Sequence, residues 1–223
     1  MNVRDELLKL QDEKYQKFQA GLVPGIDNII GVRIPDIKKI AKRLAKEPDW
    51  QKFKDNEYYE EIMIQGLLIG YANLETHERL EVIKSFVPQI TNWAVCDVVC
   101  SNFKFTQKNK EVVWKFLQPY LKSDKEYEIR FGVVMLLNYF IDDEYVDRVL
   151  KIIDCIEHDG YYAKMAVAWA LSICFVKQWD KTFKYFKHAN LSKWVYNKSI
   201  QKACESLRIS DERKKILKSL KKI

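Results

Sequence analysis

Residues 94–100, AVCDVVC, place one polar residue among apolar and small residues, and this pattern recurs along the chain. In each recurrence a polar residue stands at the centre of the segment, and we call these central residues the anchors. The segments are 62–68 (IMIQGLL), 94–100 (AVCDVVC), 127–133 (YEIRFGV), 161–167 (YYAKMAV) and 195–201 (VYNKSIQ). Successive anchors, Gln65, Asp97, Arg130, Lys164 and Lys198, are 32, 33, 34 and 34 positions apart. A period of this length is typical of stacked helical repeats.

Amphipathic segments of roughly 10 to 18 residues surround the anchors and occur in pairs. Short polar connections such as 73–76 and 121–124 separate them. Two helices per repeat predict an all-α solenoid, in which each repeat buries its apolar stripe against its neighbours. Equivalent positions then point the same way, so four anchors should form a row lining a concave, basic groove: Asp97, Arg130, Lys164 and Lys198. The alternative is that these residues are ordinary solvated helix positions.

The composition favours the same fold class. The chain has 223 residues, of which 48% are apolar and 13% aromatic, which is typical of a folded protein rather than a disordered one. With 7 Gly and 5 Pro it has too few turn residues for a β-sandwich or barrel. We predict one HEAT-like repeat domain over residues 1–223. No apolar run is long enough to span a bilayer and residues 1–10 are polar, so we expect a cytoplasmic protein.

The two ends of the chain differ from the repeats. Residues 15–46 hold three glycines and two prolines, which predicts a short helix, an irregular loop and a second helix beginning near Pro35 and Asp36. Residues 211–223 are rich in lysine, with apolar Ile216, Leu217 and Leu220, and predict a terminal helix that caps the stack.

Cysteine and histidine spacing gives no metal pattern. The five cysteines, Cys96, Cys100, Cys155, Cys174 and Cys204, lie in apolar segments without CxxC spacing, so we interpret them as buried, reduced thiols. The three histidines show no HExxH arrangement. The sequence therefore predicts neither a metal nor a cofactor.

The formal net charge of +7 suits a polyanionic partner such as nucleic acid, although a lysine-rich composition alone also produces a basic protein. Candidate phosphate contacts are basic residues on the predicted helices and the segments that follow them. They are Arg33, Lys38, Lys42, Lys104, Lys108, Lys164, Lys198 and Lys202.

A candidate reacting group lies in the second repeat. Trp93 and Asp97 are four positions apart on a predicted helix and so share one face. The repeat places Arg130 at the position equivalent to Asp97, and Trp169 one further unit along, so we expect the four side chains to converge. An N3- or N7-alkylated purine is already cationic and leaves without a proton donor. One carboxylate would then suffice to stabilise the oxocarbenium-like sugar and orient a water. The two rings would pack on the sugar, and the arginine would hold a phosphate.

Four stretches carry a family resemblance: 30–36 (IGVRIPD), 92–97 (NWAVCD), 129–130 (IR) and 166–169 (AVAW). In their order and approximate spacing they resemble the AlkD-like DNA alkylation-repair family over nearly the whole chain. The resemblance implies a HEAT-like repeat fold and a monofunctional DNA glycosylase that excises N3- and N7-alkylpurines from double-stranded DNA without a metal or cofactor. It implies that Asp97 is the catalytic carboxylate, assisted by Trp93, Arg130 and Trp169, and that base flipping into a tight pocket is not required.

Two other functions fit the same fold. The family has branches that bind branched or distorted DNA without known excision, and helical-repeat proteins also act as protein-interaction scaffolds. A carboxylate among cations at one repeat position favours the glycosylase over both alternatives. Nothing in the sequence indicates an obligate oligomer, so we expect a monomer.

Overall fold

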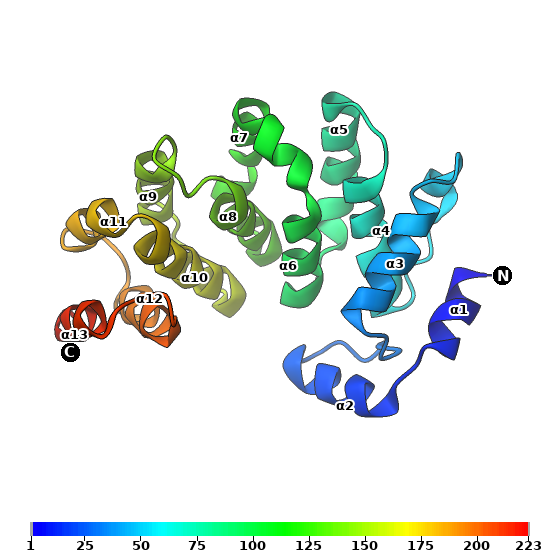
Figure 1. The fold of residues 1–223 in the computed structure, drawn as a ribbon, viewed down its shortest axis with the longest axis horizontal. Coiled ribbons are helices and arrows are strands. Elements are labelled where there is room, and N and C mark those ends of the chain that lie inside the picture. Colours follow the sequence, from blue (N-terminus) through cyan, green and yellow to red (C-terminus); the bar gives the residue numbers. More distant parts are fainter. Residues whose placement is uncertain (1, 223) are drawn as a thin grey trace. The chain divides into compact units, whose positions relative to one another are not determined.

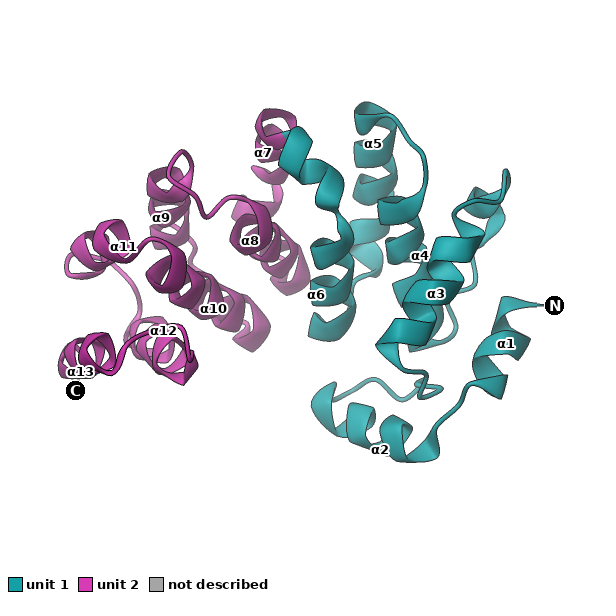
Figure 2. Cartoon of the chain, in the orientation of Figure 1, with its two compact units in different colours: residues 1–109 teal, residues 110–223 magenta. Residues whose placement is uncertain are grey.

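A computed structural model describes residues 2–222, and over this range the chain is helical and contains no β-strand (Figure 1). The all-α prediction is therefore confirmed. The chain divides into two compact units, residues 1–109 and 110–223, each described here by itself (Figure 2). The expectation of one domain over residues 1–223 stays a prediction, as does the concave groove.

Unit 1 holds the α-helices α1 (Val3–Lys9), α2 (Glu13–Leu22), α3 (Ile34–Leu44), α4 (Tyr59–Tyr71), α5 (Thr76–Phe86) and α6 (Trp93–Asn102). It also has the short 3-10 helices η1 (Trp50–Lys52), η2 (Val87–Gln89) and η3 (Lys104–Lys108). Helices α3, α4 and α6 pack in succession, and α5 packs against α4. The close approach of α4 and α6 depends on Gly66, where an added Cβ would lie 2.4 Å from Val99.

The N-terminal part of unit 1 follows the predicted order of short helix, loop and helix. Helix α2 begins at its N-cap Asp12, and α3 begins after Arg33 with Pro35 in its first turn. The intervening loop turns at Gly25 and Gly31, whose φ angles are 82° and 96°. The prediction for residues 15–46 is confirmed, because Pro24, Gly25 and Gly31 lie in the loop between the two helices.

A fully buried carboxylate holds this loop. Glu60 of α4 accepts hydrogen bonds from the main-chain N–H groups of Ile30 (2.9 Å), Gly31 (2.7 Å) and Val32 (3.1 Å). Three charge-assisted bonds offset the cost of burying the charge. The loop containing the IGVRIPD stretch is thereby fixed to α4.

Unit 2 holds α7 (Lys110–Leu117), α8 (Glu126–Tyr139), α9 (Val146–Asp154), α10 (Tyr161–Lys177), α11 (Trp179–Phe186), α12 (Lys193–Glu205) and α13 (Asp211–Ser219), with the 3-10 helix η4 (Tyr120–Lys122). Helices α8, α10 and α12 pack side by side in a central row. Helix α9 contacts α10 and α11, and α13 packs on α12 (Figure 1). The apolar side of α13 is anchored by Leu217, which is fully buried, whereas Ile216 is 43% exposed.

All five anchors lie on alternate α-helices: Gln65 on α4, Asp97 on α6, Arg130 on α8, Lys164 on α10 and Lys198 on α12. Within unit 1 α4 packs on α6, and within unit 2 α10 packs on both α8 and α12. The predicted helix-pair repeat is confirmed. The predicted terminal helix extends only to Ser219, and Ile223 lies outside the described residues.

The cysteine prediction is correct in part. Cys96, Cys100 and Cys174 are buried free thiols. Cys155 is exposed, because it follows the last turn of α9, and Cys204 is partly exposed. Among the described residues, no helix is long and apolar enough to cross a membrane.

Candidate functional site

Helix α6 positions the proposed carboxylate. The side chain of Asn92 caps the helix by accepting a 2.9 Å hydrogen bond from the N–H of Val95, so the helix begins at Trp93. Asp97 follows one turn later, and both side chains are partly buried. The first two turns of α6 therefore present an indole and a carboxylate on one face, as the four-residue spacing predicts.

The indole of Trp93 is fixed by another part of unit 1. Its Nε1–H donates a 2.8 Å hydrogen bond to the carbonyl oxygen of Leu22, the last residue of α2. On the same helix, Phe18 is 61% exposed and its ring lies 6.3 Å from that of Tyr15. Helix α2 thus adds exposed apolar surface beside the start of α6.

The far end of α6 is held against α4. The side-chain Nδ2 of Asn102 donates a 3.1 Å hydrogen bond to the carbonyl oxygen of Leu67 and fits against Gly70, where an added Cβ would lie 2.2 Å from it. With the Trp93 bond at one end and the Asn102 bond at the other, α6 presents Asp97 from a firmly packed element.

The other two predicted residues lie in unit 2. Arg130 on α8 is 4% exposed, and its Nη1 donates a 2.9 Å hydrogen bond to the carbonyl oxygen of Tyr162 at the start of α10. Trp169 lies near the middle of α10 and is partly buried. The structure therefore pairs Trp93 with Asp97 on one helix of unit 1 and places Arg130 and Trp169 on packed helices of unit 2. The convergence of all four stays a prediction.

Comparison with known proteins identifies the family. Residues 3–206 match the family described as DNA alkylation repair enzyme. The chain belongs to that family. None of the curated proteins matches the chain. As a member of the DNA alkylation repair enzyme family, the protein has a role in the repair of alkylated DNA, and the resemblance drawn from the sequence is confirmed.

In this repair protein the predicted phosphate contacts differ in their surroundings. Lys42, Lys104 and Lys108 are exposed, the last two on η3. Lys38 is partly buried on α3. Lys42, Lys104 and Lys108 therefore offer exposed charge to a polyanion.

The other predicted contacts have partners within the protein. Arg33 is exposed, but its Nη2 lies 2.8 Å from Asp12 and its guanidinium 5.0 Å from the Tyr15 ring. Lys202 pairs with Glu205 at 2.9 Å. Lys164 and Lys198 place their Nζ atoms 5.6 and 5.5 Å from the centre of one ring, that of Trp194. Two anchors of the repeat therefore lie next to the same ring in unit 2, and the row of anchors stays a prediction.

A group of aromatic side chains was missed in the sequence. Tyr127 stacks on Tyr162 at 5.7 Å, Tyr162 contacts Tyr161 at 5.3 Å, and Tyr161 contacts Trp194 at 5.8 Å. They lie at the N-terminal ends of α8, α10 and α12. A signal was present, because each of the last four anchors follows an aromatic residue by three or four positions: Trp93, Tyr127, Tyr161 and Trp194.

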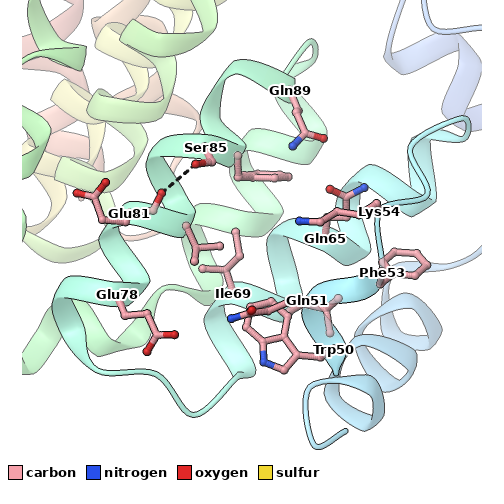
Figure 3. A pocket seen from close by; sticks show the side chains of 13 residues that line it. Trp50, Gln51, Phe53, Lys54, Gln65, Ile69, Glu78, Glu81, Ser85 and Gln89 are labelled. Carbon is pink, nitrogen blue, oxygen red and sulfur yellow. Dashed lines mark hydrogen bonds between the residues drawn. The ribbon is translucent and has the colours of Figure 1, made fainter. Parts of the chain in front are cut away.

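The described residues contain no cluster of three or more His, Cys, Asp or Glu side chains that could hold a metal ion. A cavity of about 330 Å³ lies in unit 1 between η1, α4 and α5 (Figure 3). Figure 3 shows Glu78 and Glu81 on one side and Trp50, Gln65 and Lys54 on the other. Its lining residues do not include Trp93 or Asp97. Carboxylates beside this cavity disfavour a phosphate ligand, so we do not place DNA there.

Proposed function

We propose that this protein is a DNA glycosylase of base excision repair, which removes cationic N3- or N7-alkylated purines by hydrolysing the N-glycosidic bond. Membership of the DNA alkylation repair enzyme family supports the substrate class. The single observation that carries the reaction is Asp97, a carboxylate one helical turn after Trp93 on the packed helix α6.

The proposed reaction uses one carboxylate. The bond between the anomeric carbon and the purine breaks, and its electron pair neutralises the positive charge of the base, which leaves without a proton. Positive charge develops on the deoxyribose, and the Asp97 carboxylate stabilises it electrostatically. The carboxylate also orients a water molecule, whose oxygen bonds to the anomeric carbon while its proton leaves to the carboxylate or to solvent.

The remaining residues bind rather than react. Trp93 and Trp169 offer π faces to the sugar and to the cationic charge that develops there. Trp93 is well suited to this, since its bond to Leu22 fixes the ring before DNA binds. Arg130 is almost fully buried, so we assign it a contribution of positive charge from beneath the surface to a nearby phosphate.

The test is release of free base. Wild-type protein is incubated with DNA containing N7-methylguanine or N3-methyladenine, and the base is quantified against DNA alone. We expect release above the background; a rate equal to the background contradicts the proposal.

Binding to intact, alkylated and branched DNA in the same preparations separates the alternatives. Tight DNA binding without release indicates a non-catalytic DNA-structure binder. The absence of both indicates a protein-interaction scaffold.

A further inference from the structure

Tyr161 is an exposed ring held in a fixed position. It is the first residue of α10 and is 55% exposed. Its ring stands nearly perpendicular to that of Tyr162, at 84°, and meets that of Trp194 at 67°. Edge-to-face contacts of this kind restrict the orientation of the ring, while more than half of the Tyr161 surface stays exposed. Tyr162 is in turn stacked on Tyr127, which extends the support to α8.

Two cations border the ring that supports Tyr161. The Nζ atoms of Lys164 and Lys198 lie 5.6 and 5.5 Å from the centre of the Trp194 ring. Lys164 follows Tyr161 by three positions on α10, so their side chains share one helix face. Lys198 also donates a 2.8 Å hydrogen bond from Nζ to Oε1 of Gln201, which holds its charge near α12. An aromatic face and two ammonium groups are therefore gathered at the starts of α10 and α12.

A cavity next to Trp194 has carboxylates in its lining. It has a volume of about 450 Å³ and is lined by Trp194 and Lys164 together with Asp154, Glu157 and Asp159. The carboxylates disfavour a phosphate inside this cavity, and neither Tyr161 nor Lys198 is among its lining residues. The acidic cavity thus limits where a phosphate chain can lie and leaves the Tyr161 ring as the stacking surface.

We propose that Tyr161, Lys164 and Lys198 form a binding subsite for single-stranded DNA, in which an unpaired base stacks on the Tyr161 ring and the two lysines hold adjacent phosphates. An exposed aromatic ring beside cations is the arrangement by which proteins bind unpaired nucleotides, because every base has a π face. The subsite rests on the proposed function, because the subsite and the glycosylase activity both require that the protein binds DNA. The subsite lies within unit 2 and contains no residue that takes part in the proposed reaction.

The experiment measures binding of the full chain to a short fluorescent oligodeoxythymidylate and to an oligomer of the same length that carries abasic sites throughout. Tyr161→Ala should weaken binding of the oligodeoxythymidylate by about 5- to 100-fold, the range for loss of one stacked base. Tyr161→Phe keeps the ring and should bind like wild type. The abasic oligomer should bind equally to wild type and Tyr161→Ala, since it has no base to stack.

The lysines are tested with the same oligomers. Lys164→Gln and Lys198→Gln should weaken both oligomers and each reduce the slope of log affinity against log salt by about 0.7, the value for one phosphate contact on a single strand. Lys215→Gln on α13, an exposed lysine remote from Tyr161 in sequence, is the control and should leave the salt slope unchanged.

The subsite is overturned if Tyr161→Ala binds the oligodeoxythymidylate like wild type, or if it weakens both oligomers equally. Base release by the same preparations keeps the two proposals apart. If wild type releases free base and Tyr161→Ala binds the oligomers like wild type, the glycosylase proposal is supported and the subsite is contradicted. If Tyr161→Ala weakens binding of the oligodeoxythymidylate alone and wild type releases no free base, the subsite is supported and the glycosylase proposal is contradicted.

Discussion

The indole nitrogen of Trp93 donates a 2.8 Å hydrogen bond to the main-chain carbonyl oxygen of Leu22, across 71 positions of sequence. The bond ties the end of α2 to the start of α6, the helix that carries Asp97. It fixes the ring plane of Trp93 and also satisfies a carbonyl at a helix terminus that has no partner within its own helix. The proposed reacting helix is therefore positioned partly by the N-terminal segment of the chain.

Trp93→Phe should loosen α2. The phenyl ring keeps most of the packing but leaves the Leu22 carbonyl without its donor, at a cost of about 1 kcal/mol. Hydrogen exchange of the main-chain amides of Leu22, Val23, Gly25 and Ile26 should speed up, while α8 and α10 stay protected. Trp194→Phe, which replaces an indole by a phenyl ring in unit 2, is the control. Unchanged amide hydrogen exchange at the end of α2 in Trp93→Phe would show that the hydrogen bond does not hold this segment.

Gly31→Ala should destabilise the protein by about 2 kcal/mol or more. The φ of 96° is unfavourable for alanine, and the new Cβ would lie 2.6 Å from Cβ of Gln16 and 2.7 Å from the carbonyl oxygen of Asp12. Gly21→Ala on α2 is the matched control, because nothing lies within 4 Å of its added Cβ, and there alanine should be neutral or stabilising. Urea unfolding measures the free energy of unfolding of both variants. Equal values for Gly31→Ala and Gly21→Ala would mean that the loop does not require glycine at position 31.

Glu6→Gln should lower stability at neutral pH and have less effect in acid. Two hydrogen bonds from the Arg43 guanidinium, of 2.9 and 2.5 Å, hold the pKa of the Glu6 carboxyl below its ordinary value of 4.5. A lowered folded-state pKa means that the stabilisation is present above about pH 4.5 and is lost as the pH falls through the folded-state value. Urea unfolding at several pH values should show a difference of about 1 kcal/mol at pH 7 that shrinks in acid. A difference that persists unchanged in acid would contradict this origin.

Native-state thiol labelling should distinguish the cysteines. Cys155 is exposed and should react first with a disulfide reagent, followed by the partly exposed Cys204. Burial raises the pKa of the Cys174 thiol to about 12, so this thiol should stay unreactive until the protein unfolds, together with buried Cys96 and Cys100. Mass spectrometry of the labelled peptides gives the order. Rapid labelling of Cys174 in the folded protein would contradict the packing of α10.

The anchor period predicted the helical repeat because every repeat needs the same polar position between the same apolar contacts. Gln65, Arg130 and Lys198 accordingly lie on α4, α8 and α12. The glycines and prolines of residues 15–46 predicted the loop before α3 for an equally local reason, since they set the backbone angles directly.

Features made by contacts distant in sequence were not predictable in this way. The hydrogen bond from Trp93 to Leu22 depends on which helices pack together. So do the hydrogen bonds that the buried Glu60 accepts from the loop before α3. Arg130 was predicted to hold a phosphate, which stays a prediction, but nothing in the sequence indicated that this residue is almost fully buried and bonds to the start of α10. Burial is a property of the packed helices, and the charge of the side chain does not indicate it.

The candidate site was predictable from the sequence only in part. The spacing of Trp93 and Asp97 predicted their shared face on α6, because four positions make about one helical turn. The aromatic group around Tyr161 was overlooked, although its members precede the anchors by three or four positions, because an aromatic residue at helical spacing is more often part of the core. Only the 55% exposure of Tyr161 separates it from a core residue.

Base excision by this protein should require the Asp97 carboxylate, and the rate of N7-methylguanine release by wild type and Asp97→Asn under excess enzyme tests this requirement. We predict a loss of about 10²- to 10³-fold for Asp97→Asn, the effect of removing one electrostatic stabiliser. The matched control is Asp147→Asn on α9, whose carboxylate forms an exposed pair with Lys181 at 3.1 Å and should keep the wild-type rate. Release by Asp97→Asn at the wild-type rate would contradict this requirement.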